Sequence, residues 1–113
     1  MKLVGRVPRA ALVGGEFVRL LYPPFDVLVA LVDGAPFAIE DACNHAGASL
    51  VDGTRHGDRV ACPMHGYIFS LRTGELLEPR RLCDAQRTFV TTEEGDDVIV
   101  WDAFSVAVWN PGA

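Results

Sequence analysis

The sequence has too few cysteines for a disulfide scaffold, because it holds three in 113 residues, an odd number. It has no apolar run near the roughly 20 residues that a membrane helix needs. Residues 1–9 show neither a long apolar core nor a small-residue cleavage site, so we expect no secretory signal. Nine scattered arginines and a single lysine form no basic stripe, which disfavours a nucleic-acid partner. These absences predict a soluble cytoplasmic protein with neither membrane nor nucleic acid as a partner.

The composition is that of one folded domain, which we place over residues 1–113. Half of the residues are apolar, 22% are charged and the formal net charge is −5. Eleven glycines and seven prolines favour a turn-rich chain of short strands over a helical bundle. The sequence therefore predicts an all-β protein.

Alternating apolar residues between turn signals predict where the strands lie. Asp33-Gly34 between two apolar runs indicates one hairpin, and the acidic stretch 93–97 indicates a second. A short helix is expected at 8–12, ended by Gly14-Gly15. Two loop-rich stretches, 41–57 and 62–66, carry cysteine and histidine. The predicted strands are 16–22, 27–32, 36–40, 58–61, 67–71, 75–77, 88–92 and 98–101.

Those two stretches hold the chemically informative residues of the chain. Cys43-Asn44-His45 and Cys62-Pro63-Met64-His65 are separated by the residues 46–61. Each loop supplies one thiol and one imidazole, so the four side chains can converge on a metal centre. Tetrahedral zinc is one candidate, although the spacing within each pair is unusual for a zinc finger and no recognition helix follows.

The same residues resemble the Rieske family, through Cys43-x-His45, the intervening sixteen residues, Cys62-Pro63-x-His65-Gly66, and the later Gly66-Tyr67-x-Phe69 and Thr73-Gly74. In such proteins two cysteines hold one iron of a 2Fe–2S cluster and two histidines hold the other. The resemblance therefore implies that Cys43 and Cys62 bind one iron, and that His45 and His65 bind the second. It also implies a base of antiparallel strands with an inserted cluster-binding subdomain, about 41–78.

The resemblance implies an electron carrier rather than an enzyme. With three histidines in all, only His56 remains for a mononuclear iron site, and no dinucleotide fingerprint is present. We expect a soluble Rieske ferredoxin that carries single electrons from an NAD(P)H-dependent flavin reductase to a terminal oxygenase, an aromatic-ring-hydroxylating dioxygenase. Two alternatives stay open, namely a small electron-transfer subunit of a nitrite-reductase-like enzyme and a non-redox zinc-binding module.

The residues around the motif indicate which kind of Rieske protein to expect. Respiratory members carry an extra disulfide, whose positions here are Ala48 and Met64. High-potential members have a serine and a tyrosine hydroxyl near the cluster, at positions held here by Tyr67 and Phe69. Fewer donors stabilise the reduced cluster less, so we expect a reduction potential of about −150 mV.

Other residues carry weaker signals. Cys83 lies in the stretch 79–85, expected to pack beside the cluster, and is interpreted as a space-filling thiol. Arg80 and Arg81 form a solvated face there or help to dock an acidic partner. Pro63 and Met64 are expected to form an apolar rim around the histidines. The apolar tail 103–113 packs on the core or contacts a partner.

Overall fold

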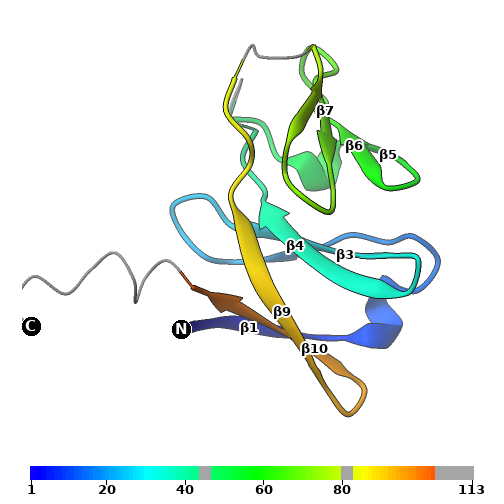
Figure 1. The fold of residues 1–113 in the computed structure, drawn as a ribbon, viewed down its shortest axis with the longest axis vertical. Helices are drawn as coiled ribbons and strands as arrows, with labels where there is room; N and C mark the ends of the chain where they lie inside the picture. Colours follow the sequence, from blue (N-terminus) through cyan, green and yellow to red (C-terminus); the bar gives the residue numbers. More distant parts are fainter. Residues whose placement is uncertain (44–46, 80–82, 104–113) are drawn as a thin grey trace, which may run out of the picture.

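The computed structural model describes residues 1–43, 47–79 and 83–103, and it folds them into two antiparallel sheets (Figure 1). The larger sheet has six strands in the order β1-β10-β9-β4-β3-β2, and the smaller has four in the order β5-β6-β7-β8. No α-helix occurs in these ranges, so the predicted all-β class is confirmed. The strands are β1 (Lys2–Pro8), β2 (Val18–Leu20), β3 (Val27–Val32), β4 (Ala35–Glu40), β5 (Thr54–His56), β6 (Arg59–Ala61), β7 (Ile68–Ser70), β8 (Leu76–Glu78), β9 (Thr88–Glu94) and β10 (Asp97–Asp102); two 3₁₀ turns are η1 (Arg9–Leu12) and η2 (Leu50–Asp52).

Both predicted hairpins are confirmed. Asp33 and Gly34 join β3 to β4 with positive φ angles of 51° and 80°, as a type I′ turn requires. The second hairpin joins β9 to β10 by a tighter turn than the sequence indicated. Glu94 pairs with Asp97, so only Gly95 and Asp96 remain in the turn and both strands extend into the acidic stretch.

Three sequence-based predictions need correction. Strand β1 was not predicted, since its residues do not alternate and its pairing with β10 is interrupted between Leu3 and Gly5. The strand predicted at 16–22 is limited to β2. His56 was interpreted as a loop residue but lies in β5, exposed, where a two-residue Gly57-Asp58 turn pairs β5 with β6.

Strand β3 is buried on both faces, which explains its continuous apolar sequence. Val27 and Val29 point into a core within the larger sheet, together with Val7, Leu12, Ala38, Val98 and Val100. Leu28, Ala30 and Val32 point into a second core that continues into the smaller sheet. That second core also contains Val60, Phe69, Leu76 and two of the motif residues, Cys43 and Cys62. The two sheets therefore share one apolar core, and the cysteines are part of it. The smaller sheet lies within the predicted subdomain of about 41–78, whose bounds stay a prediction.

Two arginines tie the smaller sheet to the larger one. Arg55 Nη2 donates to the carbonyl of Leu31 at 2.5 Å, and its guanidinium lies 5.8 Å from the centre of the Phe17 ring. Arg72 Nη2 donates to Asp33 Oδ2 at 2.5 Å. These contacts fix the smaller sheet over the β3–β4 hairpin.

Gly74 marks the closest backbone approach between the smaller sheet and the segment that leads into β9. The backbone N–H of Gln86 donates to Gly74 O at 2.7 Å. A Cβ at position 74 would lie 2.2 Å from Gln86 O, and φ at Gly74 is +74°. Gly95 also has a positive φ, +58°, but a Cβ there would meet nothing within 4 Å.

Gly74→Ala and Gly95→Ala should therefore differ by the steric clash alone, since both carry the strain of a left-handed alanine. We expect Gly74→Ala to lower the free energy of unfolding by about 1–3 kcal/mol more than Gly95→Ala does. Urea unfolding followed by circular dichroism measures both. Equal losses would show that the contact between Gly74 and Gln86 is not tight.

Candidate metal centre

Each of the two predicted loops is closed by an equivalent backbone hydrogen bond, although the loop sequences differ. The backbone N–H of Cys43 donates to Ala48 O at 2.8 Å, and that of Cys62 donates to Tyr67 O at 2.7 Å. Each cysteine thus stands at the same place in its loop, five residues before the carbonyl that closes it. The repeated geometry gives two similar supports that present their cysteines to a common core.

Glycine closes each loop immediately before that carbonyl. Gly47 has φ +72° and Gly66 has φ +68°, angles that favour glycine. His65 also has a positive φ, +67°, which is uncommon for a residue with a side chain and strains the backbone. Such local strain is typical of functional sites, and it occurs here at one of the predicted ligands.

The thiols of Cys43 and Cys62 lie together in the core. Each residue is 2% exposed, and both cysteines are free rather than disulfide-bonded. Burial raises the pKa of the Cys62 thiol to about 11, the backbone N–H of Met64 lowers it, and a hydrogen bond and the charge of Cys43 raise it further. Two adjacent thiolates in an apolar core need a cation, which the irons of a cluster provide.

His65, three residues after Cys62, lies at the surface. His65 is exposed, and so are its neighbours Pro63 and Met64, the latter 49% exposed. His45 lies outside the described residues. Within residues 1–43, 47–79 and 83–103, no three metal-binding side chains gather at one point. In a Rieske-type cluster one iron takes two thiolates and the other takes two imidazoles, so the buried pair Cys43 and Cys62 suits the sulfur-bound iron. The described residues therefore fit a 2Fe–2S cluster.

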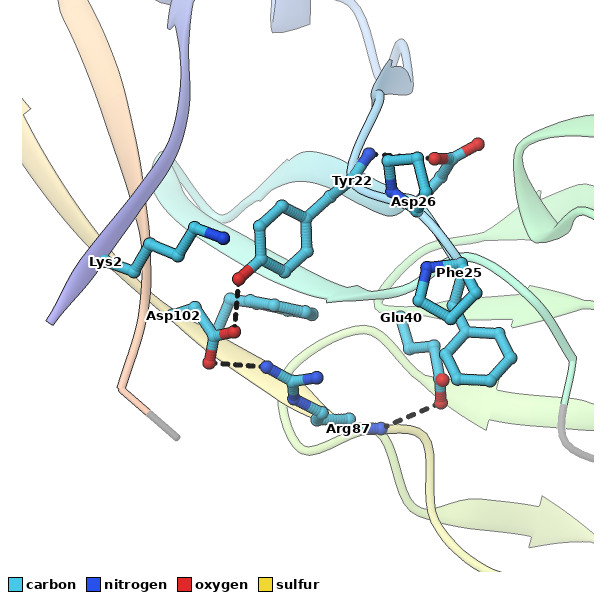
Figure 2. Close-up of a pocket in the computed structure, with 10 residues that line it drawn as sticks. Lys2, Tyr22, Phe25, Asp26, Glu40, Arg87 and Asp102 are labelled. Carbon is cyan, nitrogen blue, oxygen red and sulfur yellow. Dashed lines mark hydrogen bonds and ion pairs between the residues drawn. The ribbon is translucent and has the colours of Figure 1, made fainter. Parts of the chain in front are cut away.

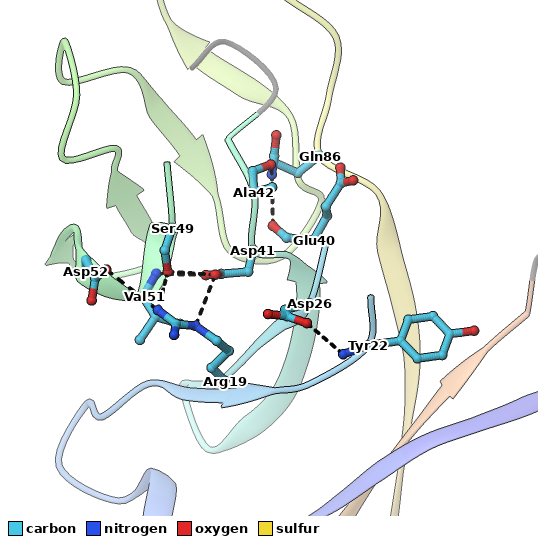
Figure 3. Close-up of polar contacts among 10 residues, drawn as sticks. All are labelled: Arg19, Tyr22, Asp26, Glu40, Asp41, Ala42, Ser49, Val51, Asp52 and Gln86. Atoms are coloured by element: carbon cyan, nitrogen blue, oxygen red, sulfur yellow. Dashed lines mark hydrogen bonds and ion pairs between the residues drawn. The ribbon is translucent and has the colours of Figure 1, made fainter. Parts of the chain in front are cut away.

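A buried carboxylate holds the stem of the first loop (Figure 3). Asp41, 3% exposed, accepts hydrogen bonds from Val51 N at 2.9 Å and from Ser49 Oγ at 2.6 Å. Arg19 Nε lies 3.3 Å from the same carboxylate. The backbones of Ala42 and Ser49 also pair as an isolated antiparallel β-bridge. Asp41, two residues before Cys43, thus connects the two arms of the loop.

A buried amide holds the same stem from the opposite side. Gln86, 2% exposed, donates through Nε2 to Glu40 O at 2.8 Å and to Ala42 O at 2.7 Å (Figure 3). Sequence reasoning missed Asp41 and Gln86, because neither belongs to a local motif. Only the tertiary fold shows that their polar atoms satisfy the backbone beside Cys43.

The weaker predictions have mixed outcomes. Cys83 is half-buried and packs on the core that contains Cys43, in keeping with a space-filling thiol. Burial and then the charges of Cys43 and Asp84 raise the pKa of this thiol. Phe69 is fully buried and has no hydroxyl to donate. Arg80, Arg81 and the tail from 104 lie outside the described residues.

A comparison with known families decides the class of the protein. The profile of the Rieske [2Fe-2S] domain matches residues 7–89, most of the chain. The chain belongs to the Rieske family. Its fold is therefore the Rieske fold, and its cofactor is one Rieske 2Fe–2S cluster, as the sequence predicted. Family membership also argues against the zinc-binding alternative.

Individual relatives of this Rieske protein are ferredoxin components of dioxygenases. The biphenyl 2,3-dioxygenase ferredoxin component of Rhodococcus jostii is 41% identical over 86 residues, covering 76% of this chain and 79% of the relative. The 3-phenylpropionate/cinnamic acid dioxygenase ferredoxin subunit of Shigella boydii is 32% identical over 105 residues, covering 88% and 93%. A chain in a complex of reduced oxygenase and oxidized ferredoxin in carbazole 1,9a-dioxygenase has a TM-score of 0.76 and 26% identity, covering 89% and 91%. The predicted resemblance to dioxygenase ferredoxins is confirmed.

One further structural feature bears on location. Across the parts of the chain that the structure describes, no helix is long and apolar enough to cross a membrane.

The role of Asp41 can be tested against a nearby exposed carboxylate. Asp41→Asn removes a buried charge that accepts two hydrogen bonds, so we expect a loss of about 2–3 kcal/mol in the free energy of unfolding and faster bleaching of the cluster. Asp52 also lies near Arg19, at 3.6 Å, but its side chain is 71% exposed. Asp52→Asn should cost less than about 0.5 kcal/mol. Thermal unfolding and visible absorbance measure both effects, and similar losses would contradict the role of Asp41.

Proposed function

We propose that this Rieske protein is a ferredoxin that carries single electrons from an NAD(P)H-dependent flavin reductase to a terminal oxygenase that hydroxylates aromatic rings. The observation that carries the proposal is the pair of buried thiols beside an exposed histidine, in a chain similar over most of its length to dioxygenase ferredoxins. The reductase, the cytoplasmic location and the aromatic substrate class belong to the proposal. Membership of a complex with an oxygenase is known for the carbazole system and supports the acceptor.

The proposed ligands are Cys43 and Cys62 for one iron and His45 and His65 for the other. Bound there, the cluster supplies a one-electron redox couple. Cys43 and Cys62 would hold the cluster away from water, because both lie in the core shared by the two sheets. His65, which is exposed, would bring the cluster within reach of a partner.

The surface around His65 suits brief contacts. Pro63 and Met64 are exposed apolar residues on the same loop as His65, which supports the predicted apolar rim around the histidines. A small, partly apolar contact is typical of weak redox complexes, which must form and dissociate within each electron transfer. This arrangement favours a carrier that visits two partners.

Of the alternatives that the sequence left open, a subunit of a nitrite-reductase-like enzyme would use the same cluster in a permanent complex. Its large catalytic partner would distinguish it from a free carrier during gel filtration of a native extract. Elution near the mass of the chain supports the ferredoxin, and elution only with a large subunit supports the alternative.

The cysteine assignment has a matched control in this chain. Cys62→Ser should abolish the cluster, because it removes a thiolate ligand. Cys83→Ser should retain the cluster, since Cys83 only packs beside the core. Iron and sulfide content and visible absorbance measure the difference. A cluster of full content in Cys62→Ser would disprove the assignment.

The histidine assignment has a similar control. His45→Cys or His65→Cys exchanges a neutral imidazole for a thiolate, so the potential should fall from about −150 mV toward the roughly −400 mV of all-cysteine clusters, or the cluster should be lost. His56→Cys should leave the potential unchanged, because His56 is an exposed residue of β5. Redox titration followed by electron paramagnetic resonance measures this. Unchanged potentials in all three variants would contradict the assignment.

A further inference from the structure

A small polar pocket lies beside the stem of the first cluster loop, at the end of the larger sheet (Figure 2). Its volume is about 190 Å³, and it lies among β1, β9, β10 and the residues that precede β3. Three aromatic rings, those of Tyr22, Phe25 and Phe89, contribute to its wall. The proposed cluster ligands do not line it.

On one side of the pocket the buried carboxylate already has partners within the chain. Asp102, 3% exposed, forms an ion pair with Arg87 and accepts a hydrogen bond from the Tyr22 hydroxyl at 2.5 Å. The Lys2 ammonium lies 5.2 Å from the centre of the Tyr22 ring, so a cation of the chain itself occupies this side. Aromatic faces next to buried carboxylates therefore attract cations here.

The other side holds a buried carboxylate without such a partner. Glu40 is 8% exposed and its side chain points into the pocket next to Phe25 (Figure 2). Its carboxylate has one long contact, with the backbone N–H of Arg87 at 3.5 Å. Among the described residues no cationic side chain forms an ion pair with it. A buried charge is costly unless it is paired, so this half of the pocket favours an incoming cation.

We propose that this pocket receives an arginine side chain of an electron-transfer partner. A planar guanidinium can bind the Glu40 carboxylate through two hydrogen bonds while it stacks on the Phe25 ring, which a lysine ammonium cannot do. The volume suits one side chain and is below the roughly 300 Å³ at which pockets for cofactors and small molecules begin. Arginine is also among the residues that most often anchor protein interfaces. The proposal rests on the proposed function for the identity of the partner.

The position of the pocket links it to the surface that carries the cluster. A second hollow, of about 350 Å³, shares Phe25 and Asp26 with the pocket and reaches Gly47 in the first cluster loop. Asp52 also lines this hollow and is largely exposed. Phe25, 50% exposed, adds apolar area to both hollows. A partner that covers the cluster loops can therefore extend over this hollow and place an arginine beside Glu40.

The direct test uses an arginine derivative as the probe and the cluster-loaded full chain as the protein. N-acetyl-L-arginine amide should shift the Phe25 and Phe89 ring signals in nuclear magnetic resonance spectra and should saturate. The corresponding citrulline amide, which is uncharged, should not. Glu40→Gln keeps the shape of the side chain and should weaken probe binding about tenfold. Equal shifts with citrulline, or unchanged binding in Glu40→Gln, would overturn the proposal.

The partner is tested by electron transfer to the oxygenase and from the reductase. Glu40→Gln should raise KM for the ferredoxin about tenfold in at least one reaction, with kcat, cluster content and potential unchanged. Phe25→Leu should raise the same KM, and Glu94→Gln at the far end of β9 should change it less than about twofold. An unchanged KM in Glu40→Gln would overturn only the proposal that the pocket receives a partner arginine. Failure of the wild-type chain to transfer electrons would overturn the proposed function instead. Binding of the arginine probe would then still test whether the pocket receives an arginine.

Discussion

Two thiols held side by side in an apolar core are the constraint on which the rest of the structure depends. Cys43 and Cys62 belong to the core that joins the two sheets, so the metal centre and the fold share the same contacts. Negative charge there is unfavourable without a cation, and the loop backbones cannot lose their hydrogen bonds. Asp41 and Gln86 meet this second need, because they satisfy the backbone beside Cys43 from two sides. Cluster, loops and sheets are therefore expected to gain and lose stability together.

The sequence predicted those parts of the fold that depend on local patterns. The doubly buried β3 and its Asp33-Gly34 turn were evident from an apolar run and a hairpin dipeptide. The motif likewise indicated all four proposed ligands, because thiol and imidazole at that spacing have few other uses. Strand β1 escaped prediction, since its pattern does not alternate and its pairing with β10 is long-range. Asp41 and Gln86 escaped as well, because they belong to no local motif and their hydrogen-bond partners, 8 to 46 residues away in sequence, come close only in the folded chain.

Function follows from the contrast between the two ends of the site. The thiols are closed off in the core, whereas His65 and Met64 meet solvent on one loop. A carrier needs this contrast, because one end must protect the centre and the other must contact partners. Phe69 has no hydroxyl to stabilise the reduced cluster, which is the basis for predicting a reduction potential of about −150 mV. The pocket at Glu40 adds a second, charge-based contact outside the cluster loops.

The central claim is that two irons are held unequally, one by two sulfurs and the other by two imidazoles. The most direct measurement is electron–nuclear double resonance on the reduced protein, prepared with ¹⁵N-labelled histidine. The account predicts couplings to two histidine nitrogens, carried by the iron that the cysteines do not bind. A reduced cluster that shows no histidine coupling, or coupling to one nitrogen only, would contradict it.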